Sequence, residues 1–439
     1  MRDIVLVLFI LGSVPFIFKR PWIGAVLWAW ISLMNPHRFT WGFAYDFQVA
    51  MIIGGSTLLA FVFKLKDVKA PPKNGAMIAL GLFVLWLNIT LPFSFNLEQV
   101  YGMWDKVMKI MLMLFVTSML IIEKRQIQVL TWVVALSIGL LGLKGGLFTV
   151  LQGGENRVWG PAGSFIEGNN EIGLAFIVVI PLMYYLHEQV TDKRIRWALL
   201  ACIAGSAAAA LGTHSRGALL AIAAMTLFLW LKSPRKLLNG FIIVLLSPLL
   251  YFFMPEKWHD RMATIETYQD DASAMGRINA WQMAYNLAKD NFFGGGFQIY
   301  DGNIFARYAP DPEKVHAAHS IYFQILGEHG FIGLFLYILV GFMTWRLATR
   351  LIKQADGKNE LRWISLFCRM SQVSIAGFAV GGAFLSLAYF DLPYYLLIIM
   401  STMDRWLRGQ QTASPVAMQM GNGTRPVRGM AATSERKTL

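Results

Sequence analysis

Charged side chains are scarce in this sequence of 439 residues. Only 15% of the residues are Asp, Glu, Lys or Arg, whereas 56% are hydrophobic. Soluble domains normally carry about 25% charged residues, so the composition argues against a soluble fold. Cysteine is almost absent, and Cys202 and Cys368 both lie in apolar stretches. We expect two buried thiols rather than a disulfide or a metal site.

Several familiar catalytic patterns are also missing. The sequence contains no Walker-type phosphate loop, no Cys/His cluster with metal-ligand spacing and no nucleophile elbow around His214 and Ser215. We therefore expect no metal and no cofactor. A convincing internal repeat is absent too, which weakens a secondary-transporter interpretation.

Long apolar runs dominate what is present. A helix needs about 20 mainly apolar residues to cross a bilayer, and many runs approach or reach that length. The sequence therefore predicts an all-α integral membrane protein with about 12 transmembrane helices. The principal runs are Met77–Phe95, Val107–Ile122, Val129–Val150, Ile172–Leu186, Trp197–Leu211, Ala218–Leu231, Leu237–Phe253, Ile321–Leu347 and Val373–Leu387.

The formal net charge of +13 is interpreted as the positive-inside bias of a membrane protein, not as a nucleic-acid site. Basic clusters follow alternate apolar runs and are expected to face the cytoplasm. They are Lys64–Lys73, Glu123–Arg125, Asp192–Arg196, Lys232–Lys236 and Arg346–Arg362. The segments expected on the opposite side are Asn96–Asp105, Gln152–Asn170, Gly212–Arg216, Pro255–His319 and Tyr389–Pro393.

Four regions follow from this pattern. They are N-terminal transmembrane helices at 1–254 (nine or ten spans), a large outside loop at 255–318, C-terminal transmembrane helices at 319–409 and a disordered cytoplasmic tail at 410–439. The first run, Ile4–Phe18, is interpreted as a retained segment. Lys19 and Arg20 suggest a cytoplasmic turn and an N-terminus outside, although a re-entrant or kinked hairpin is equally compatible.

The outside loop at 255–318 is far longer than any other, and long ordered loops are usually functional. Helices are predicted at Trp258–Thr267 and Ala274–Lys289. A flexible turn is predicted at Gly294–Gly296, followed by an aromatic-rich segment.

Two arginines stand out at the outer helix ends. Arg216 lies where one span ends and the next begins, and its planar guanidinium suits a phosphate; snorkelling to lipid headgroups is the structural alternative. Arg277 and Trp281 are four residues apart on one helix face, where a cation–π pair with only a structural role is the alternative.

Histidines and a polar loop complete the candidate site. His319 lies where the long loop re-enters the membrane and can accept a proton near neutral pH, and His316 is one turn earlier. Between Arg157 and Glu171, a Gly- and Asn-rich loop indicates either a capped helix start or a substrate-lining loop that favours anions. Its candidate binding residues are Arg157, Asn169, Asn170 and Glu171.

Together these motifs resemble the O-antigen ligase family of bacterial membrane glycosyltransferases, and most of all the O-glycosylation ligases associated with exosortase systems. The resemblance rests on the many spans and on Ser215–Ala218, Gly276–Trp281, His319–Ser320 and Gly168–Glu171, with Pro181–Leu182 downstream. It covers 145–406 well and the earlier spans by hydropathy alone.

The resemblance implies about twelve helices, a fold like that of GT-C-type transferases, cytoplasmic termini and a periplasmic site in the inner membrane. The implied reaction transfers a polysaccharide from undecaprenyl diphosphate to lipid A–core oligosaccharide without a metal, in lipopolysaccharide biosynthesis. Arg216 and Arg277 would stabilise the leaving diphosphate, and His319 would be the general base of an inverting displacement. Trp281, His316 and the polar loop would contact substrate, loop aromatics could stack on sugars, and helix grooves could hold the polyprenyl tail.

Two other classes remain open. An O-antigen polymerase or a protein O-oligosaccharyltransferase would use the same donor with another acceptor. A lipid-linked glycan transporter would bind the diphosphate without chemistry, but it should show internal repeats and a charged central cavity.

Overall fold

The computed structural model describes residues 1–232 and 272–421, with isolated positions between those ranges. Over these residues the regular elements are α-helices joined by turns and short 3-10 helices. The helices before the gap are α1 Arg2–Lys19, α2 Trp22–Met34, α3 Val49–Phe63, α4 Gly75–Thr90, α5 Leu97–Leu120, α6 Lys124–Leu151, α7 Asn169–Gln189, α8 Lys193–Gly212 and α9 Arg216–Lys232. Those after it are α12 Ala272–Asp290, α13 Gly302–Tyr308, α14 Ile321–Ala355, α15 Arg362–Gly382 and α16 Asp391–Gly421.

Among the described residues, six helical segments are long and apolar enough to cross a membrane. They are Gly75–Phe93, Lys124–Leu151, Asn169–Gln189, Lys193–Gly212, Ile321–Ala355 and Asn359–Gly382. Three shorter apolar helices accompany them: Trp22–Met34, Val49–Phe63 and Arg216–Trp230. Large apolar side chains such as Phe335 and Phe342 point outward from the bundle, as lipid contact requires. The described part of the chain is thus all-helical and has the spans of a multi-pass membrane protein, while the total of about twelve spans stays a prediction.

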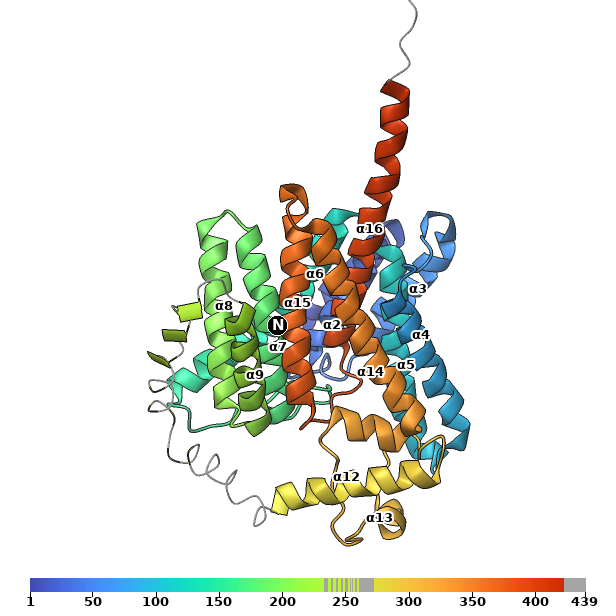
Figure 1. Cartoon of the computed structure of the whole chain (residues 1–439), viewed down its shortest axis with the longest axis vertical. Helices are drawn as coiled ribbons and strands as arrows, with labels where there is room; N and C mark the ends of the chain where they lie inside the picture. Colours follow the sequence, from blue (N-terminus) through green and yellow to red (C-terminus); the bar gives the residue numbers. More distant parts are fainter. Residues whose placement is uncertain are drawn as a thin grey trace, which may run out of the picture.

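The two ends of the bundle differ (Figure 1). At one end, which we call the loop face, α12 and α13 lie beneath the spans. At the other end, the tail face, α16 projects outward. The guanidinium of Arg405 there donates to the carbonyls of Ala70 and Ile121, at 3.0 and 2.7 Å, and Lys124 lies 5.1 Å from the ring centroid of Trp363. Segments from separate basic clusters therefore meet at the tail face.

The first hairpin, formed by α1 and α2, is held by contacts at both ends of α1. Lys64 donates a hydrogen bond to the carbonyl of Lys19, so the turn between α1 and α2 lies beside a basic cluster. At the other end of α1, a carboxylate oxygen of Asp3 accepts from the amides of Gly42 and Ala44, both at 3.0 Å. The turn between α1 and α2 is thus tied to a basic cluster, whereas Figure 1 shows the N-terminus about halfway between the two faces, so the side on which it lies stays a prediction.

The core is centred on α7, which packs against α6, α8, α9 and α15. The α6–α8 contact depends on small side chains. A Cβ atom at Gly146 would lie 2.2 Å from the carbonyl oxygen of Gly205, and one at Gly142 would lie 2.0 Å from the hydroxyl of Ser206. Small residues let helix backbones approach closely in membranes, where packing rather than hydrophobicity drives association.

Helix α14 is broken near its start. Gly330 has φ 69° and ψ −174°, and the segment before it runs along the loop face before the helix turns into the bundle (Figure 1). The break leaves carbonyls without partners, and the amides of Gly295 and Gly296 donate to those of Gly327 and Glu328, both at 2.9 Å. The Gly294–Gly296 turn is therefore held by hydrogen bonds to the start of α14, whereas its composition predicts a flexible turn.

The expected boundaries need one adjustment. Helix α16 continues to Gly421, beyond the predicted end of the last span at 409, and residues 422–439 lie outside the described part of the chain. The predicted loop helix at Trp258–Thr267 falls almost wholly outside it as well, whereas the predicted helix at Ala274–Lys289 is present as α12.

Candidate active site

Helix α12 holds the segment that leads into α14. Asn279 is buried, and its amide group donates to the carbonyls of Asp311 and Lys314, at 2.8 and 3.0 Å, and accepts from the Asp311 amide at 2.9 Å. Trp281 donates from its indole nitrogen to the carbonyl of Ala318 at 2.7 Å. The chain from 311 to 318 is therefore fixed against α12 at both ends.

Two histidines of this segment lie close together beside α12. A Cβ atom at Gly276 would lie 2.9 Å from Cδ2 of His316, so a larger residue at this position would displace the imidazole ring. The rings of His316 and His319 have centroids 5.3 Å apart. His319 has φ +43°, a left-handed conformation that is uncommon outside glycine and costs about 1 kcal/mol or more. Such strain is typical of functional positions.

His319 faces a carboxylate from another helix. Its Nδ1 lies 3.9 Å from Oε1 of Glu171 in the first turn of α7, and this buried nitrogen makes no hydrogen bond within the described chain. Arg277 of α12 interacts electrostatically with both side chains. Burial, then Arg277 and then His316 lower the pKa of His319 to about 4. The imidazole is consequently neutral near pH 7 and can accept a proton.

The start of α7 is shaped around Glu171. A Cβ atom at Gly168 would lie 2.0 Å from Oε2 of Glu171, so a larger residue there would displace the carboxylate. Asn169 is buried and donates from its amide to the carbonyl of Thr213 at 2.8 Å. Asn170 is half-buried in the same turn. The bond from Asn169 joins this turn to the connection between α8 and α9.

Arg216 begins α9 at that connection. The hydroxyl of Ser215 caps the helix by accepting from the Ala218 amide at 3.1 Å. A Cβ atom at Gly217 would lie 3.7 Å from Cβ of Phe384, so α9 starts against the turn after α15. Arg216 is half-buried at the loop face, next to the residues that Asn169 ties to α7. The structure thus joins His319, Glu171, Arg277 and His316 directly, and Arg216 through neighbouring contacts.

Two groups of predicted residues lie elsewhere. Arg157 is exposed and lines a different pocket, on the α6 side of the 157–168 loop. The loop aromatics Phe297, Phe305 and Tyr308 are at most 5% exposed, so the expectation that they stack on sugars is wrong for these three. Phe305 and Tyr308 pack in the core beside α12, and Phe297 packs in the main core of the bundle. The indole nitrogen of Trp281 is hydrogen-bonded to the Ala318 carbonyl, and its ring stacks on that of Phe323 with the ring centroids 5.0 Å apart.

Sequence reasoning missed a buried polar network behind the site. The hydroxyl of Tyr389 donates to Glu328 at 2.5 Å and lies 2.8 Å from Nε2 of His329, whose Nδ1 lies 2.7 Å from the hydroxyl of Thr90. The signal was present, because Glu328 and His329 interrupt an otherwise apolar run, and ionisable residues inside a span usually have a task.

These features define a multi-pass membrane protein with a neutral histidine, a carboxylate and arginines gathered at one face. Residues 198–338 match the family model described as O-antigen ligase, and this match supports the resemblance to the O-antigen ligase family. Residues 1–191 match a family model described as a family of unknown function. The comparison with curated proteins finds no match. The first match contains Arg216, Arg277 and His319, whereas Glu171 lies in the second.

Proposed function

We propose that this protein is an O-antigen ligase that transfers a polysaccharide from undecaprenyl diphosphate to lipid A–core oligosaccharide. The match to this family supports a membrane enzyme of the glycosyltransferase type that acts on lipid-linked glycans. The observation that carries the proposal is the position of the His319 imidazole, whose buried Nδ1 lies 3.9 Å from the carboxylate of Glu171.

The acid–base step follows from that pair. An acceptor sugar hydroxyl must lose its proton as its oxygen attacks the anomeric carbon of the donor. His319 is neutral and takes up this proton, a contribution of typically about 10²–10⁴-fold in rate. The imidazolium that forms is stabilised by the carboxylate of Glu171, as an acidic partner stabilises a catalytic histidine in other enzymes.

The diphosphate leaving group needs positive charge around its phosphate oxygens. As the bond between the anomeric carbon and the diphosphate breaks, negative charge grows on the phosphate oxygens. Arg277 and Arg216 present guanidinium groups at the same face, and each can hold two oxygens at once. Fixed positive charges of this kind supply the electrostatic stabilisation, and the step as written needs no metal. Direct displacement inverts the anomeric centre.

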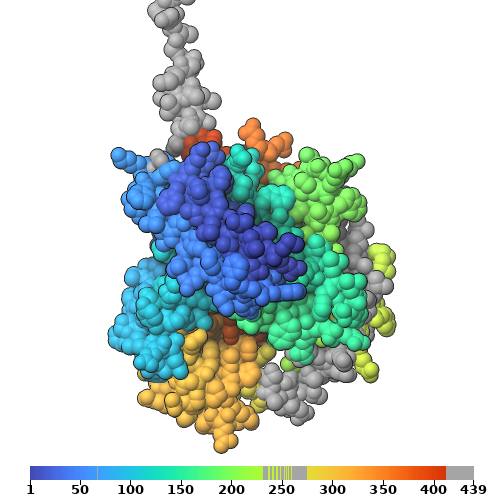
Figure 2. Space-filling model, turned by 180° about the vertical axis from the view of Figure 1, so that it is seen from behind, coloured from blue at the N-terminus to red at the C-terminus, as the bar shows by residue number. Residues whose placement is uncertain are grey.

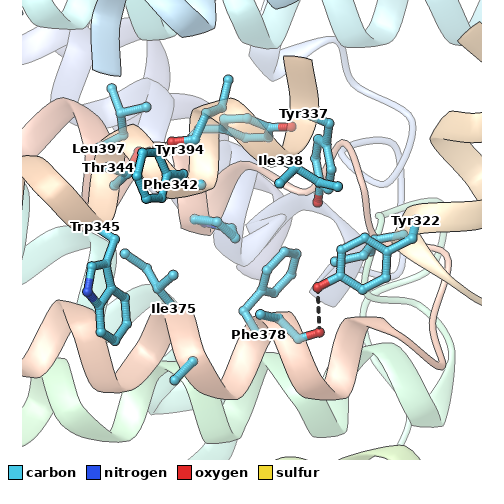
Figure 3. A pocket seen from close by; sticks show the side chains of 16 residues that line it. Tyr322, Tyr337, Ile338, Phe342, Thr344, Trp345, Ile375, Phe378, Tyr394 and Leu397 are labelled. Carbon is cyan, nitrogen blue, oxygen red and sulfur yellow. Dashed lines mark hydrogen bonds between the residues drawn. The ribbon is translucent and has the colours of Figure 1, made fainter. Parts of the chain in front are cut away.

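An apolar pocket of about 350 Å³ beside the site suits the polyprenyl tail of the donor. It lies between α14, α15 and α16, and Figure 3 shows Tyr322 at one end and Trp345 at the other. Tyr322 is three residues after His319, and its hydroxyl donates to the carbonyl of Ala379 at 2.9 Å. A tail in this pocket would start next to the reacting diphosphate and extend toward the tail face.

Orientation follows from charge. Segments from separate basic clusters meet at the tail face through Arg405 and Lys124, and positive loops remain in the cytoplasm. The loop face and the site would then be periplasmic, in the bacterial inner membrane. Because His319 at that face is outside the apolar span Ile321–Ala355, hydrophilic acceptors can reach it from water.

The test is transfer by the purified protein in lipid nanodiscs. Wild type and the variants His319→Ala and Arg277→Lys receive a glycan on undecaprenyl diphosphate and lipid A–core, in EDTA. We expect transfer by wild type, none by His319→Ala and a large loss with Arg277→Lys, because lysine cannot make a bidentate contact. Full activity of His319→Ala would remove the proposed base.

The acceptor is varied in the same assay. Transfer to a protein, or to a second donor molecule, in place of lipid A–core would identify an oligosaccharyltransferase or a polymerase. Movement of the lipid-linked glycan across the bilayer without transfer to any acceptor would identify a transporter.

A further inference from the structure

A separate cationic pocket lies beside the start of α7, and neither Arg277 nor His319 lines it. It has a volume of about 270 Å³ and is formed by the last turns of α6, the segment 157–161, the first turns of α7 and Phe39. Its walls are mostly apolar and aromatic, and its cations are Lys144 and Arg157. In Figure 2 the teal surface of α6 and its following loop borders the blue N-terminal region.

Lys144 is unusual for its position. It lies inside the membrane-spanning helix Lys124–Leu151, seven residues before its end, which places it about 10 Å along the axis from that end. Its side chain is exposed on the bundle surface, and Nζ lies 4.6 Å from the ring centroid of Phe39. A cation within a span is costly to keep and commonly has a functional task.

Arg157 is presented by a rigid loop. The neighbouring amide of Val158 donates to the carbonyl of Gly212 at 3.1 Å, and the amide of Gly160 donates to that of Glu167 at 2.8 Å. A Cβ atom at Gly160 would lie 1.6 Å from the carbonyl oxygen of Ile166, so the loop closes tightly on itself. Between these bonds Trp159 is exposed at the rim, as aromatic residues are at a membrane–water interface.

We propose that this pocket binds the phosphorylated headgroup of the lipid acceptor. The inference rests on the proposed function and adds where the acceptor binds. Two cations from separate elements above an apolar wall complement a molecule that carries phosphate groups next to acyl chains. Ile172 lines the pocket and directly follows Glu171, so an acceptor held here has its sugar end near His319.

The arrangement also separates two anionic substrates. The donor diphosphate is assigned to Arg277 and Arg216, and the acceptor phosphate to Lys144 and Arg157, with the first turn of α7 between them. Each substrate is held by its own pair of positive charges, and the two reacting groups meet at Glu171 and His319.

The experiment compares wild type, Lys144→Gln, Arg157→Gln and the double variant, with Lys193→Gln as a matched control. Lys193 is an exposed cation at the start of α8, away from the pocket. Each protein is checked for a monodisperse elution profile in detergent, and the single variants keep the test valid if the double variant does not fold. Transfer is measured with the intact acceptor and with an acceptor whose phosphates have been removed.

We expect the KM for the intact acceptor to rise about tenfold in the double variant, since two charged contacts are lost, with unchanged kcat and donor KM. Removal of the acceptor phosphates should raise the wild-type KM similarly and should have little further effect in the double variant. An unchanged acceptor KM in the double variant would overturn the assignment. Equal competition by phosphatidylglycerol would also overturn it, because the site would then hold a bilayer phospholipid.

Binding is measured separately, by native mass spectrometry of wild type and double variant with the acceptor alone. If wild type transfers nothing but retains the phosphorylated acceptor, and the double variant does not, the proposed function fails while the acceptor site stands. If neither protein retains the acceptor, the site assignment fails whatever the transfer assay shows.

Discussion

The indole nitrogen of Trp281 donates a hydrogen bond of 2.7 Å to the carbonyl of Ala318, the residue directly before His319. This contact gives the Gly276–Trp281 motif a positioning role. Gly276 makes room for His316, Asn279 fixes the chain at 311–314, and Trp281 fixes its end. Helix α12 therefore holds both ends of the segment that carries the candidate base.

The first prediction concerns that bond. Trp281→Phe should keep an aromatic ring beside Phe323 but lose the donor to Ala318, so that His319 is less well placed. We expect kcat to fall about tenfold with little change in either KM, since small displacements of a reacting group are costly. The matched control is Trp197→Phe, because Trp197 is 71% exposed on α8. A normal kcat in Trp281→Phe would show that the bond does not position the histidine.

The second prediction is a shift in pH dependence. Burial and then Arg277 lower the pKa of His319 to about 4, so the base is neutral above that pH and is lost as pH falls through it. Arg277→Gln removes a positive charge that opposes protonation. The acid limb of kcat/KM should therefore move to higher pH in this variant, in pH–rate profiles with both substrates varied. A limb at the same pH would mean that another group controls it.

The third prediction separates charge from shape at Glu171. Glu171→Gln keeps the size of the side chain but removes the negative charge 3.9 Å from His319. The imidazolium formed during transfer would lose its stabilising partner, and we expect kcat to fall about 10- to 100-fold. Glu155→Gln, an exposed loop variant, serves as the control. If Glu171→Gln instead raised only the donor KM, the carboxylate would act in binding rather than in proton transfer.

The sequence predicted the membrane class and the loop helix at Ala274–Lys289, because hydropathy is a local property. Motif order, through Ser215–Ala218, Gly276–Trp281 and His319–Ser320, indicated the O-antigen ligase family, whose model matches residues 198–338. The contact of Glu171 with His319 was out of reach, since 148 residues separate them and no periodicity relates α7 to the start of α14. The loop aromatics were misinterpreted because composition does not distinguish a buried ring from a sugar platform.

Lys144 could not be recognised as a pocket residue from the sequence. It lies inside the apolar run Val129–Val150, which is hydrophobic enough to predict a span despite this one lysine. Only the structure shows that Lys144 shares a pocket with Arg157. Glu328 and His329 were overlooked for the same reason, because a span is recognised by its average hydropathy while its functional residues are the exceptions to it.

The fourth prediction tests the buried network behind the site. Tyr389 precedes α16 and donates to Glu328 of α14, while its hydroxyl also contacts His329, which reaches Thr90 of α4. Because these side chains are almost completely buried, a polar group that loses its partner cannot turn to water. Tyr389→Phe should therefore lower the free energy of unfolding by about 1–3 kcal/mol.

The measurement is a double-mutant cycle of Tyr389→Phe and Glu328→Gln, followed by denaturant unfolding in mixed micelles. The pair should be coupled, so that the double variant loses less stability than the sum of the single losses. Tyr285→Phe, on an exposed tyrosine of α12, should change little. Additive losses would show that Tyr389 and Glu328 act independently.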